Sequence, residues 1–224
     1  MRELKKVRRA GLRSLLLMSV TYASLWVAGC SESKRELPIL GQKDTKVKMV
    51  DGKEVIDTIY HQIPDFEFLN QDSVLISQKN FAGKIYIADF FFTTCPTICP
   101  KMKTQMLRIY DKYKDNPKVA ILSHTIDPRH DTPGVLKEFS KNLGISGSQW
   151  QFVTGDKAKI YELGQKSYMV TATEDNTQPG GIVHSGAFIL VDENRHIRGI
   201  YDGTLPEKVD VLMKDIDLLL DKKQ

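Results

Sequence analysis

The hydrophobic positions of the chain follow two alternating spacings. Short runs of apolar, aromatic or β-branched residues predict buried strands, and apolar residues that recur every three or four positions predict helices between them. Strands alternating with helices favour an α/β fold with one central sheet. The predicted strands are 61–68, 74–76, 85–92, 119–125, 151–154, 185–191 and 196–201, and the predicted helices are 98–113, 133–143, 157–167 and 206–220.

The first 29 residues have a different pattern. Six basic residues precede the apolar run 15–27, which is too short for a confident membrane-spanning helix and is typical of a secretory leader. The small residues Val27, Ala28 and Gly29 stand directly before Cys30, as in a bacterial lipobox. We therefore expect residues 1–29 to be a lipoprotein signal peptide, cleaved before a lipidated Cys30. The alternative is an uncleaved anchor helix in which Cys30 is incidental.

The segment 30–60 is polar, mixed in charge and weakly periodic, which predicts a membrane tether. Within it, residues 47–59 could form a small hairpin through Asp51 and Gly52. Residues 61–224 then suffice for one domain with its own core. We expect that domain to face the periplasm or another extracytoplasmic space of a bacterium.

The positive charge of the chain belongs to the leader. Residues 1–29 carry six basic residues and one acidic residue, so their removal changes the formal net charge from +4 to −1. A basic balance in the folded part would have indicated nucleic acid or an anionic membrane as a partner. The charge balance gives no reason to expect either partner.

Two cysteines lie between the predicted strand 85–92 and the helix that follows it. Pro96 and Pro100 are tolerated only in the first turn of a helix, so Cys99 is predicted at or near the helix N-terminus. The helix dipole at that position favours a thiolate over a thiol. Cys95 and Cys99 are also the only cysteines that follow Cys30.

The four-residue offset between Cys95 and Cys99 bears on their chemistry. Cβ atoms four apart on a helix are roughly 5–6 Å apart, whereas a relaxed disulfide needs about 3.5–4.5 Å. Two thiolates that share a metal at about 2.3 Å would lie roughly 4 Å apart, so the offset suits a metal at least as well. A structural disulfide is the usual role of two exported cysteines, but a bond that closes so short a loop stabilises little. Redox or metal function is therefore favoured.

Five histidines could complete a site. His61, His130 and His196 lie in polar connections, where solvated side chains are expected. His124 lies within a predicted strand and is expected to be a hydrogen-bonded core residue. His184 follows a glycine-containing loop and opens a strand expected in the middle of the sheet, which makes it a candidate site residue.

Other candidate chemistry is weaker. Met102 and Met106 are potential copper ligands, but their helical spacing with Ile109 favours the core. The chain shows no Ser/His/Asp constellation, carboxylate pair or phosphate-binding loop.

Residues 62–222 resemble the Sco/SenC family, membrane-tethered proteins of cytochrome c oxidase assembly. The matching segments are Ile-Pro-Asp-Phe (63–66), Phe-Thr-Thr-Cys-Pro-Thr-Ile-Cys-Pro (92–100), Asp-Pro-Arg-His-Asp-Thr-Pro (127–133), and His-Ser (184–185) before Phe-Ile-Leu-Val-Asp (188–192). The resemblance implies a thioredoxin-like fold, with a central mixed β-sheet flanked by helices and an N-terminal extension.

The copper ligands of that family fall on Cys95, Cys99 and His184. Two thiolates and one imidazole suit Cu(I) or Cu(II) in a three-coordinate site, whereas structural zinc would want a fourth protein ligand. The chain departs from the family at Val183, where an acidic residue is common, and at His130, where an arginine is usual.

Two functions follow from the resemblance. The first is that of a copper chaperone, which delivers copper to the binuclear centre in the copper-site subunit of cytochrome c oxidase. The second is thiol–disulfide exchange, in which Cys95 attacks a disulfide of that subunit and Cys99 resolves the intermediate. Either function could involve a thiol reductant or another copper chaperone as a further partner.

Two related enzyme classes fit less well. A peroxiredoxin requires Pro-x3-Thr-x2-Cys, and here Ala88 and Phe92 occupy the proline and threonine positions before Cys95. A thioredoxin of the Cys-x2-Cys type is excluded by the spacing of the two cysteines.

Overall fold

The computed structural model describes residues 35–174 and 182–221. Within these ranges, only the backbone is described for residues 172–174 and 182–184. The expected leader and the lipidation of Cys30 lie outside the described residues. The elements are β1 (Lys43–Val50), β2 (Lys53–Tyr60), β3 (Glu67–Asn70), β4 (Leu75–Ser77), η1 (Gln78–Phe81), β5 (Ile85–Phe91), α2 (Cys99–Tyr113), β6 (Val119–Thr125), α3 (Pro133–Asn142), β7 (Trp150–Thr154), α4 (Lys157–Glu162), η2 (Leu163–Ser167), β8 (Ala172–Glu174), β9 (Ile182–His184), β10 (Ala187–Val191), β11 (Ile197–Asp202) and α5 (Pro206–Asp221).

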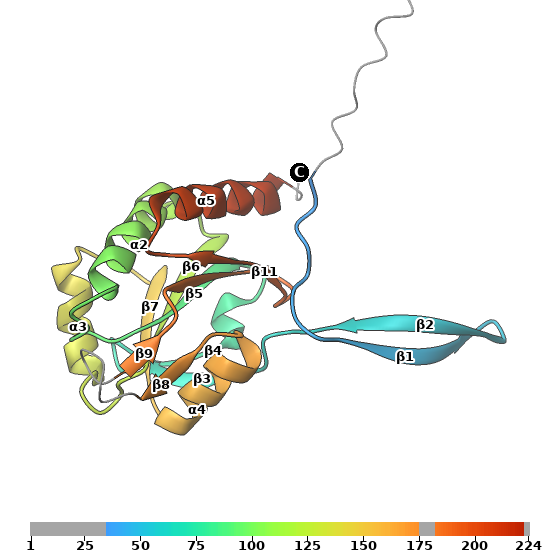
Figure 1. Ribbon diagram of the computed structural model, residues 1–224, viewed down its shortest axis with the longest axis horizontal. Helices are drawn as coiled ribbons and strands as arrows, with labels where there is room; N and C mark the ends of the chain where they lie inside the picture. The colour runs from blue at the N-terminus through green and yellow to red at the C-terminus, as the bar shows by residue number, and fades with distance from the viewer. Residues whose placement is uncertain (1–34, 175–181, 222–224) are drawn as a thin grey trace, which may run out of the picture. The chain divides into compact units, whose positions relative to one another are not determined.

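A seven-stranded mixed sheet forms the centre of the fold (Figure 1). Its strand order is β11-β10-β5-β6-β7-β3-β4. Strands β5, β6 and β7 are parallel, and the other pairs within this sheet are antiparallel. Every residue of β5, β6 and β7 is buried, because both faces of the sheet are covered. The expected α/β fold with a central mixed sheet is confirmed.

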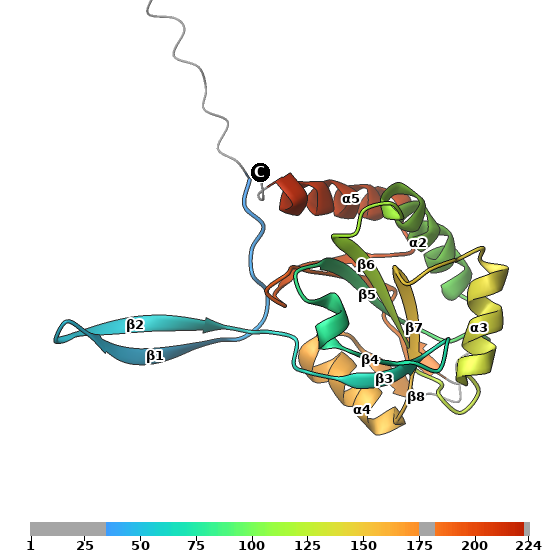
Figure 2. The same ribbon diagram turned by 180° about the vertical axis from the view of Figure 1, so that it is seen from behind.

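The two faces of β5 carry different side chains, since neighbouring residues of a strand point to opposite sides. On one face, Phe91 packs against Phe139 of α3, with ring centroids 5.3 Å apart. On the other face, Phe90 packs against Tyr168, which directly follows η2, at 5.5 Å. Figures 1 and 2 show the helices distributed around the sheet. This alternation decides which buried groups of β5 lie behind α2, the helix that begins at Cys99.

Helix α3 begins and ends as its sequence predicts. Thr132 precedes its first turn, and the Thr132 hydroxyl accepts a hydrogen bond from the Val135 N–H at 3.4 Å. Pro133 occupies the first helical position. Gly144 follows the helix with a φ of 72°, a conformation that glycine adopts at little cost.

The N-terminal extension differs from the expectation. The hairpin predicted at 47–59 begins earlier, since β1 and β2 pair from Lys43↔Tyr60 to Val50↔Lys53. Before the hairpin, Leu40 pairs with Ile197 at the start of β11. The extension is therefore fixed to the domain ahead of the hairpin as well as after it.

The segment around His184 also differs. In place of an irregular loop before His184, residues Ala172–Glu174 form β8, which pairs with β9 in a separate two-stranded sheet. His184 is the last residue of β9, and the strand of the central sheet starts at Ala187. The expectation that His184 opens a strand of the central sheet was wrong, because His184 ends β9 and two further residues precede β10.

Candidate metal centre

The backbone brings the two cysteines to one turn between β5 and α2. The strand ends at Phe91, and the Cys95 N–H donates to the Phe92 carbonyl oxygen at 3.3 Å. Helix α2 begins at Cys99, with Pro100 in its first turn. The predicted position of Cys99 at a helix N-terminus is confirmed.

Both thiols are buried and unequal in exposure. Cys95 is 7% exposed and Cys99 is 1% exposed, and they do not form a disulfide in this structure. The Cys99 thiol hydrogen-bonds to the Cys95 sulfur, and the Cys95 Sγ lies 3.7 Å from the Thr97 Oγ1. Cys95 is thus the thiol that a partner molecule can reach more readily.

The surroundings shift the two thiol pKa values in opposite directions. Burial would raise the pKa of Cys95, but hydrogen bonds from the Cys99 thiol and from the N–H groups of Cys99 and Thr97 outweigh it and lower that pKa. Burial raises the pKa of Cys99 well above its usual range, and the neighbouring Cys95 sulfur adds to this. Cys95 therefore deprotonates before Cys99.

A buried carboxyl lies behind Cys99. Asp89 and Cys99 line the same small cavity between β5 and α2. The Ser123 hydroxyl donates to Asp89 Oδ1 at 2.5 Å and accepts from the Trp150 indole N–H at 2.9 Å. Burial raises the pKa of Asp89 to about 7, although the Ser123 hydrogen bond opposes the shift.

A second buried carboxylate restrains the chain just before the cysteine turn. Asp131 accepts hydrogen bonds from the Thr93 N–H at 3.0 Å, from the Thr93 hydroxyl, and from the Thr125 hydroxyl at 2.6 Å. His130 Nδ1 lies 3.0 Å from the same carboxylate. Thr93 is two residues before Cys95, so Asp131 fixes the approach of the chain to the cysteines.

The segment of His184 packs beside the cysteine turn. The Ser185 N–H donates to the Thr171 carbonyl oxygen at 2.9 Å, which fixes the end of β9. A Cβ added at Gly186 would lie 3.8 Å from the Ile98 Cδ1, directly before Cys99. The fold thus brings the backbone near His184 to the cysteines, while the His184 side chain lies outside the described residues.

His124 is buried, as expected, but the expected hydrogen bond is wrong. Neither ring nitrogen has a hydrogen-bond partner among the described residues. The ring lies among aromatic side chains and stacks on Phe90 at 4.9 Å. Burial lowers the pKa of His124 to about 3, which keeps the imidazole neutral. The other neighbouring rings are Phe66, Phe68 and Tyr168.

The histidines in polar connections behave differently from one another. His130 is exposed, as expected, and its hydrogen bond to the Asp131 carboxylate raises its pKa. His61 is half-buried, with its Nε2 2.8 Å from the Ser167 carbonyl oxygen, and the His196 side chain is only 15% exposed. The expectation that the side chains of His61 and His196 are solvated was therefore wrong. Met102 and Met106 are buried, which confirms their place in the core.

Sequence reasoning missed the roles of Asp89 and Asp131. Asp89 carries a visible signal, since an acidic residue inside a fully apolar strand must be buried or must interrupt the strand. Asp131 stood out only as part of the segment 127–133 that matches the family, and its contact with Thr93 joins residues 38 positions apart. That contact depends on the alignment of β5 with β6 and has no local sequence signal.

The SCO1/SenC family model matches residues 57–220. The chain belongs to the SCO1/SenC family. The structure of a SCO1/SenC family lipoprotein from Bacillus anthracis is similar, with a TM-score of 0.66, 27% identity, and coverage of 71% of this chain and 95% of that one. Sco proteins of this family function in the assembly of cytochrome c oxidase.

Two further Sco structures are similar. BsSco, in which a disulfide switch was identified, is described as a member of the Sco family of cytochrome c oxidase assembly proteins; it has a TM-score of 0.63 and 31% identity, covering 71% of this chain and 93% of its own. Arabidopsis thaliana ScoI with copper bound has a TM-score of 0.59 and 24% identity, covering 70% and 98%. The latter likeness concerns the fold alone.

The described residues contain no helix long and apolar enough to cross a membrane.

Proposed function

We propose that this Sco protein is a copper chaperone that holds copper through Cys95, Cys99 and His184. It delivers the ion to the binuclear copper centre of cytochrome c oxidase during assembly. The observation that carries this proposal is the pair of hydrogen-bonded thiols at the start of α2, beside which the segment of His184 packs.

The donor set fits copper as the cargo. Two thiolates and an imidazole satisfy a three-coordinate copper ion, and soft sulfur ligands favour Cu(I). The hydrogen bond between the two thiols supports this assignment, because it brings both sulfurs together in one turn. Burial of the thiols limits competition from water.

Thiol–disulfide exchange is the second candidate, and the split between the two thiols favours it. Cys95, whose pKa is lowered, attacks a partner disulfide and releases one partner thiolate. Cys99 then loses its proton, attacks the mixed disulfide and releases the second partner thiolate. The partner gains two electrons, and Cys95 and Cys99 become a disulfide. The disulfide switch described for BsSco supports this second candidate.

The two candidates use the same sulfurs, so oxidation must remove copper binding. We propose that the protein is exported and held on a bacterial membrane by lipid on Cys30, as the likeness to a family lipoprotein supports. That compartment is oxidising, so a thiol reductant or bound copper must keep Cys95 and Cys99 functional.

Copper titration of the purified mature protein tests the ligand assignment. We expect Cys95→Ser and Cys99→Ser to lose tight binding of both copper ions, and His184→Ala to weaken Cu(II) binding at least tenfold. His184→Ala should retain reduction of a model disulfide, because exchange requires only the sulfurs. His196→Ala is the matched histidine control. Unchanged Cu(II) affinity in His184→Ala would remove that residue from the ligand set, and equal copper binding by reduced and oxidised protein would exclude both cysteines.

A further inference from the structure

We propose that the β1–β2 hairpin lies on a lipid bilayer and rests one apolar face against it. The proposal adds a second membrane contact to the chain, and it rests on the proposed attachment of the mature N-terminus to that membrane. The contact would orient the copper site relative to the membrane.

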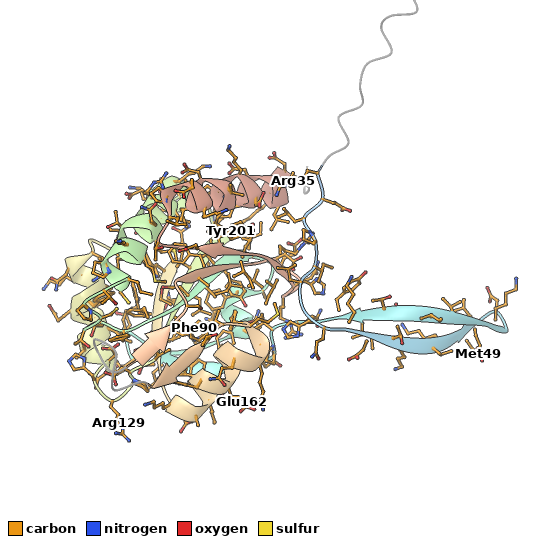
Figure 3. The ribbon with its side chains drawn as sticks, viewed as in Figure 1. Arg35, Met49, Phe90, Arg129, Glu162 and Tyr201 are labelled. Carbon is orange, nitrogen blue, oxygen red and sulfur yellow. The ribbon has the colours of Figure 1, made fainter. Side chains whose placement is uncertain are left out.

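One face of the hairpin is more apolar than the other. Residues directly paired across two strands share a face, and the register pairs Val47 with Ile56 and places Met49 on the same face. These three side chains are 58%, 69% and 65% exposed. Figure 3 shows Met49 near the tip of the hairpin. We call this surface the hairpin apolar face; it consists of Thr45, Val47, Met49, Ile56, Thr58 and Tyr60, with Lys43 and Glu54 at its two ends. The opposite face also carries exposed apolar residues, Val50, Val55 and Ile59, but among the five charged residues Asp44, Lys46, Lys48, Lys53 and Asp57.

The described part of the chain leaves this face uncovered. All residues of β1 and all but one of β2 are exposed, and Figure 1 shows no other described element packed on the hairpin. A two-stranded hairpin without further packing is marginally stable in water. Contact with another apolar surface would remove the exposed side chains from water and stabilise the hairpin.

The base of the hairpin is fixed to the domain. On the entering side, the Leu40 N–H donates to the Ile197 carbonyl oxygen at 2.8 Å. On the leaving side, the Ile63 N–H donates to the Arg195 carbonyl oxygen at 2.9 Å. The strand ends are joined by the His61 N–H, which donates to the Gln42 carbonyl oxygen at 3.1 Å. The two ends of the hairpin are thus hydrogen-bonded to each other and to the domain, and the rest of the hairpin extends from that point.

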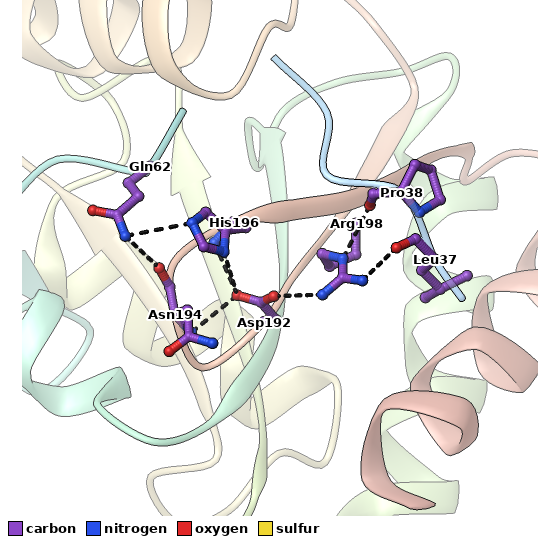
Figure 4. Close-up of polar contacts among 7 residues, drawn as sticks. All are labelled: Leu37, Pro38, Gln62, Asp192, Asn194, His196 and Arg198. Carbon is purple, nitrogen blue, oxygen red and sulfur yellow. Dashed lines mark hydrogen bonds and ion pairs between the residues drawn. The ribbon is translucent and has the colours of Figure 1, made fainter. Parts of the chain in front are cut away.

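Arg198 holds the segment before the hairpin. Its guanidinium donates to the Pro38 carbonyl oxygen at 3.0 Å and to the Leu37 carbonyl oxygen, and it pairs with the buried Asp192 at 2.8 Å (Figure 4). Asp192 also accepts from the N–H groups of Asn194 and His196 at 2.9 Å. We call Leu37, Pro38, Asp192 and Arg198 the N-terminal clasp.

The clasp makes the membrane connection short. Only residues 31–36 lie between Cys30 and Leu37, so seven residue-to-residue steps span the gap. Seven extended residues reach at most about 24 Å. An eight-residue strand is itself about 27 Å long. A domain attached through Cys30 therefore stays close enough to the bilayer for its hairpin to touch the surface.

Area argues against a second copy of the chain on the hairpin apolar face. Two strands of this length present roughly 300 Å² on one face, so two such faces would bury about 600 Å², whereas stable protein interfaces bury about 1,200–2,000 Å². A bilayer sets no such minimum for a molecule that is already attached to it, because attachment removes most of the cost of association.

The charge of the hairpin indicates which kind of lipid surface it would contact. Residues 43–60 contain four lysines and four acidic residues, so the hairpin has no net charge. Attraction to anionic lipid is therefore weak, and the contact depends on apolar area. Tyr60 ends the face with an amphipathic ring of the kind enriched at membrane interfaces.

Tryptophan fluorescence tests the contact in the mature protein reconstituted into phosphatidylcholine vesicles. Beyond the leader the chain has one tryptophan, Trp150, which is buried and gives a constant background. We expect brominated lipid to quench the added emission of Met49→Trp at least threefold more than that of Lys48→Trp, which lies on the opposite face. Replacing part of the lipid with anionic lipid should leave this ratio unchanged.

Equal quenching of the two variants, or none in either, overturns the proposal and makes a protein partner the better occupant. A second arm adds Val47→Lys and Ile56→Lys to Met49→Trp, and we expect the preferential quenching to disappear. Mass spectrometry of the mature N-terminus reports separately whether Cys30 carries lipid. If Cys30 carries no lipid, the same quenching is measured on the chain attached through its uncleaved leader. Mass spectrometry therefore tests the lipid anchor, and quenching tests the hairpin contact.

Discussion

At the residue scale, the buried carboxylate of Asp131 positions the cysteine turn, and the buried imidazole of His124 affects the stability of the core. Asp131 is fully buried and accepts hydrogen bonds from the backbone and side chain of Thr93 and from Thr125. Burying a carboxylate is favourable only when such partners are complete. Asp131 therefore acts on the site through position, since it restrains the chain two residues before Cys95.

Asp131→Ala should both destabilise the fold and loosen the copper site. The change leaves the Thr93 N–H and the Thr125 hydroxyl without their acceptor, which costs about 2–4 kcal/mol of unfolding free energy. Urea unfolding and copper titration measure the two effects. Thr132→Ala is the control, because it removes the cap of α3 at a cost of about 1 kcal/mol without contacting Thr93. Unchanged copper affinity in Asp131→Ala would refute the positioning role.

His124 should make the fold sensitive to acid. Its folded pKa of about 3 lies below the ordinary value of 6.5, so between these values the unfolded state binds more protons than the folded state. The free energy of unfolding should therefore fall as the pH is lowered from about 6.5 towards 3. His124→Phe should reduce that slope and raise stability at pH 5 relative to the parent. Urea unfolding at pH 7 and pH 5 measures the slope, and parallel profiles would contradict this origin.

At the scale of elements, the strands and helices that depend on local sequence alone could be predicted. β5 and β6 were predictable because their continuous apolar runs are buried on both faces, and α3 because Thr132, Pro133 and Gly144 mark its ends. β8 and β9 have three residues each and gave no periodic signal. The bulge between Leu190 and Val191 and the pairing of β5 with β10 arise from packing between distant segments.

The candidate site divides in the same way. Cys95 and Cys99 were predictable from spacing and prolines, because strand, turn and helix follow one another directly. His184 was singled out by its sequence context and by resemblance, and β9 changed its expected place. The unequal thiol pKa values could not be predicted, since they depend on burial and hydrogen bonds across the turn.

At the scale of the whole molecule, the N-terminal clasp joins the start of the described chain to the edge strand β11. Arg198→Ala should release Leu37 and Pro38 and leave Asp192 buried without its cation. We expect hydrogen exchange at the Leu40 N–H to accelerate at least tenfold. Arg195→Ala is the matched control, because its partner Asp65 is 91% exposed and the pair contributes little. Equal exchange in both variants would show that the clasp does not hold the segment.

The N-terminal clasp also bears on the order in which parts of the protein can fold, because it joins segments that are far apart in the sequence. Arg198 meets Pro38 across 160 residues of sequence, and a chain crossing a membrane from its N-terminus delivers these partners at opposite ends of its passage. The cysteine turn, β5 and β6 emerge well before β11 can receive Leu40. For the export proposed above, residues 37–40 would emerge first and would reach their positions on β11 only after the rest of the domain had emerged.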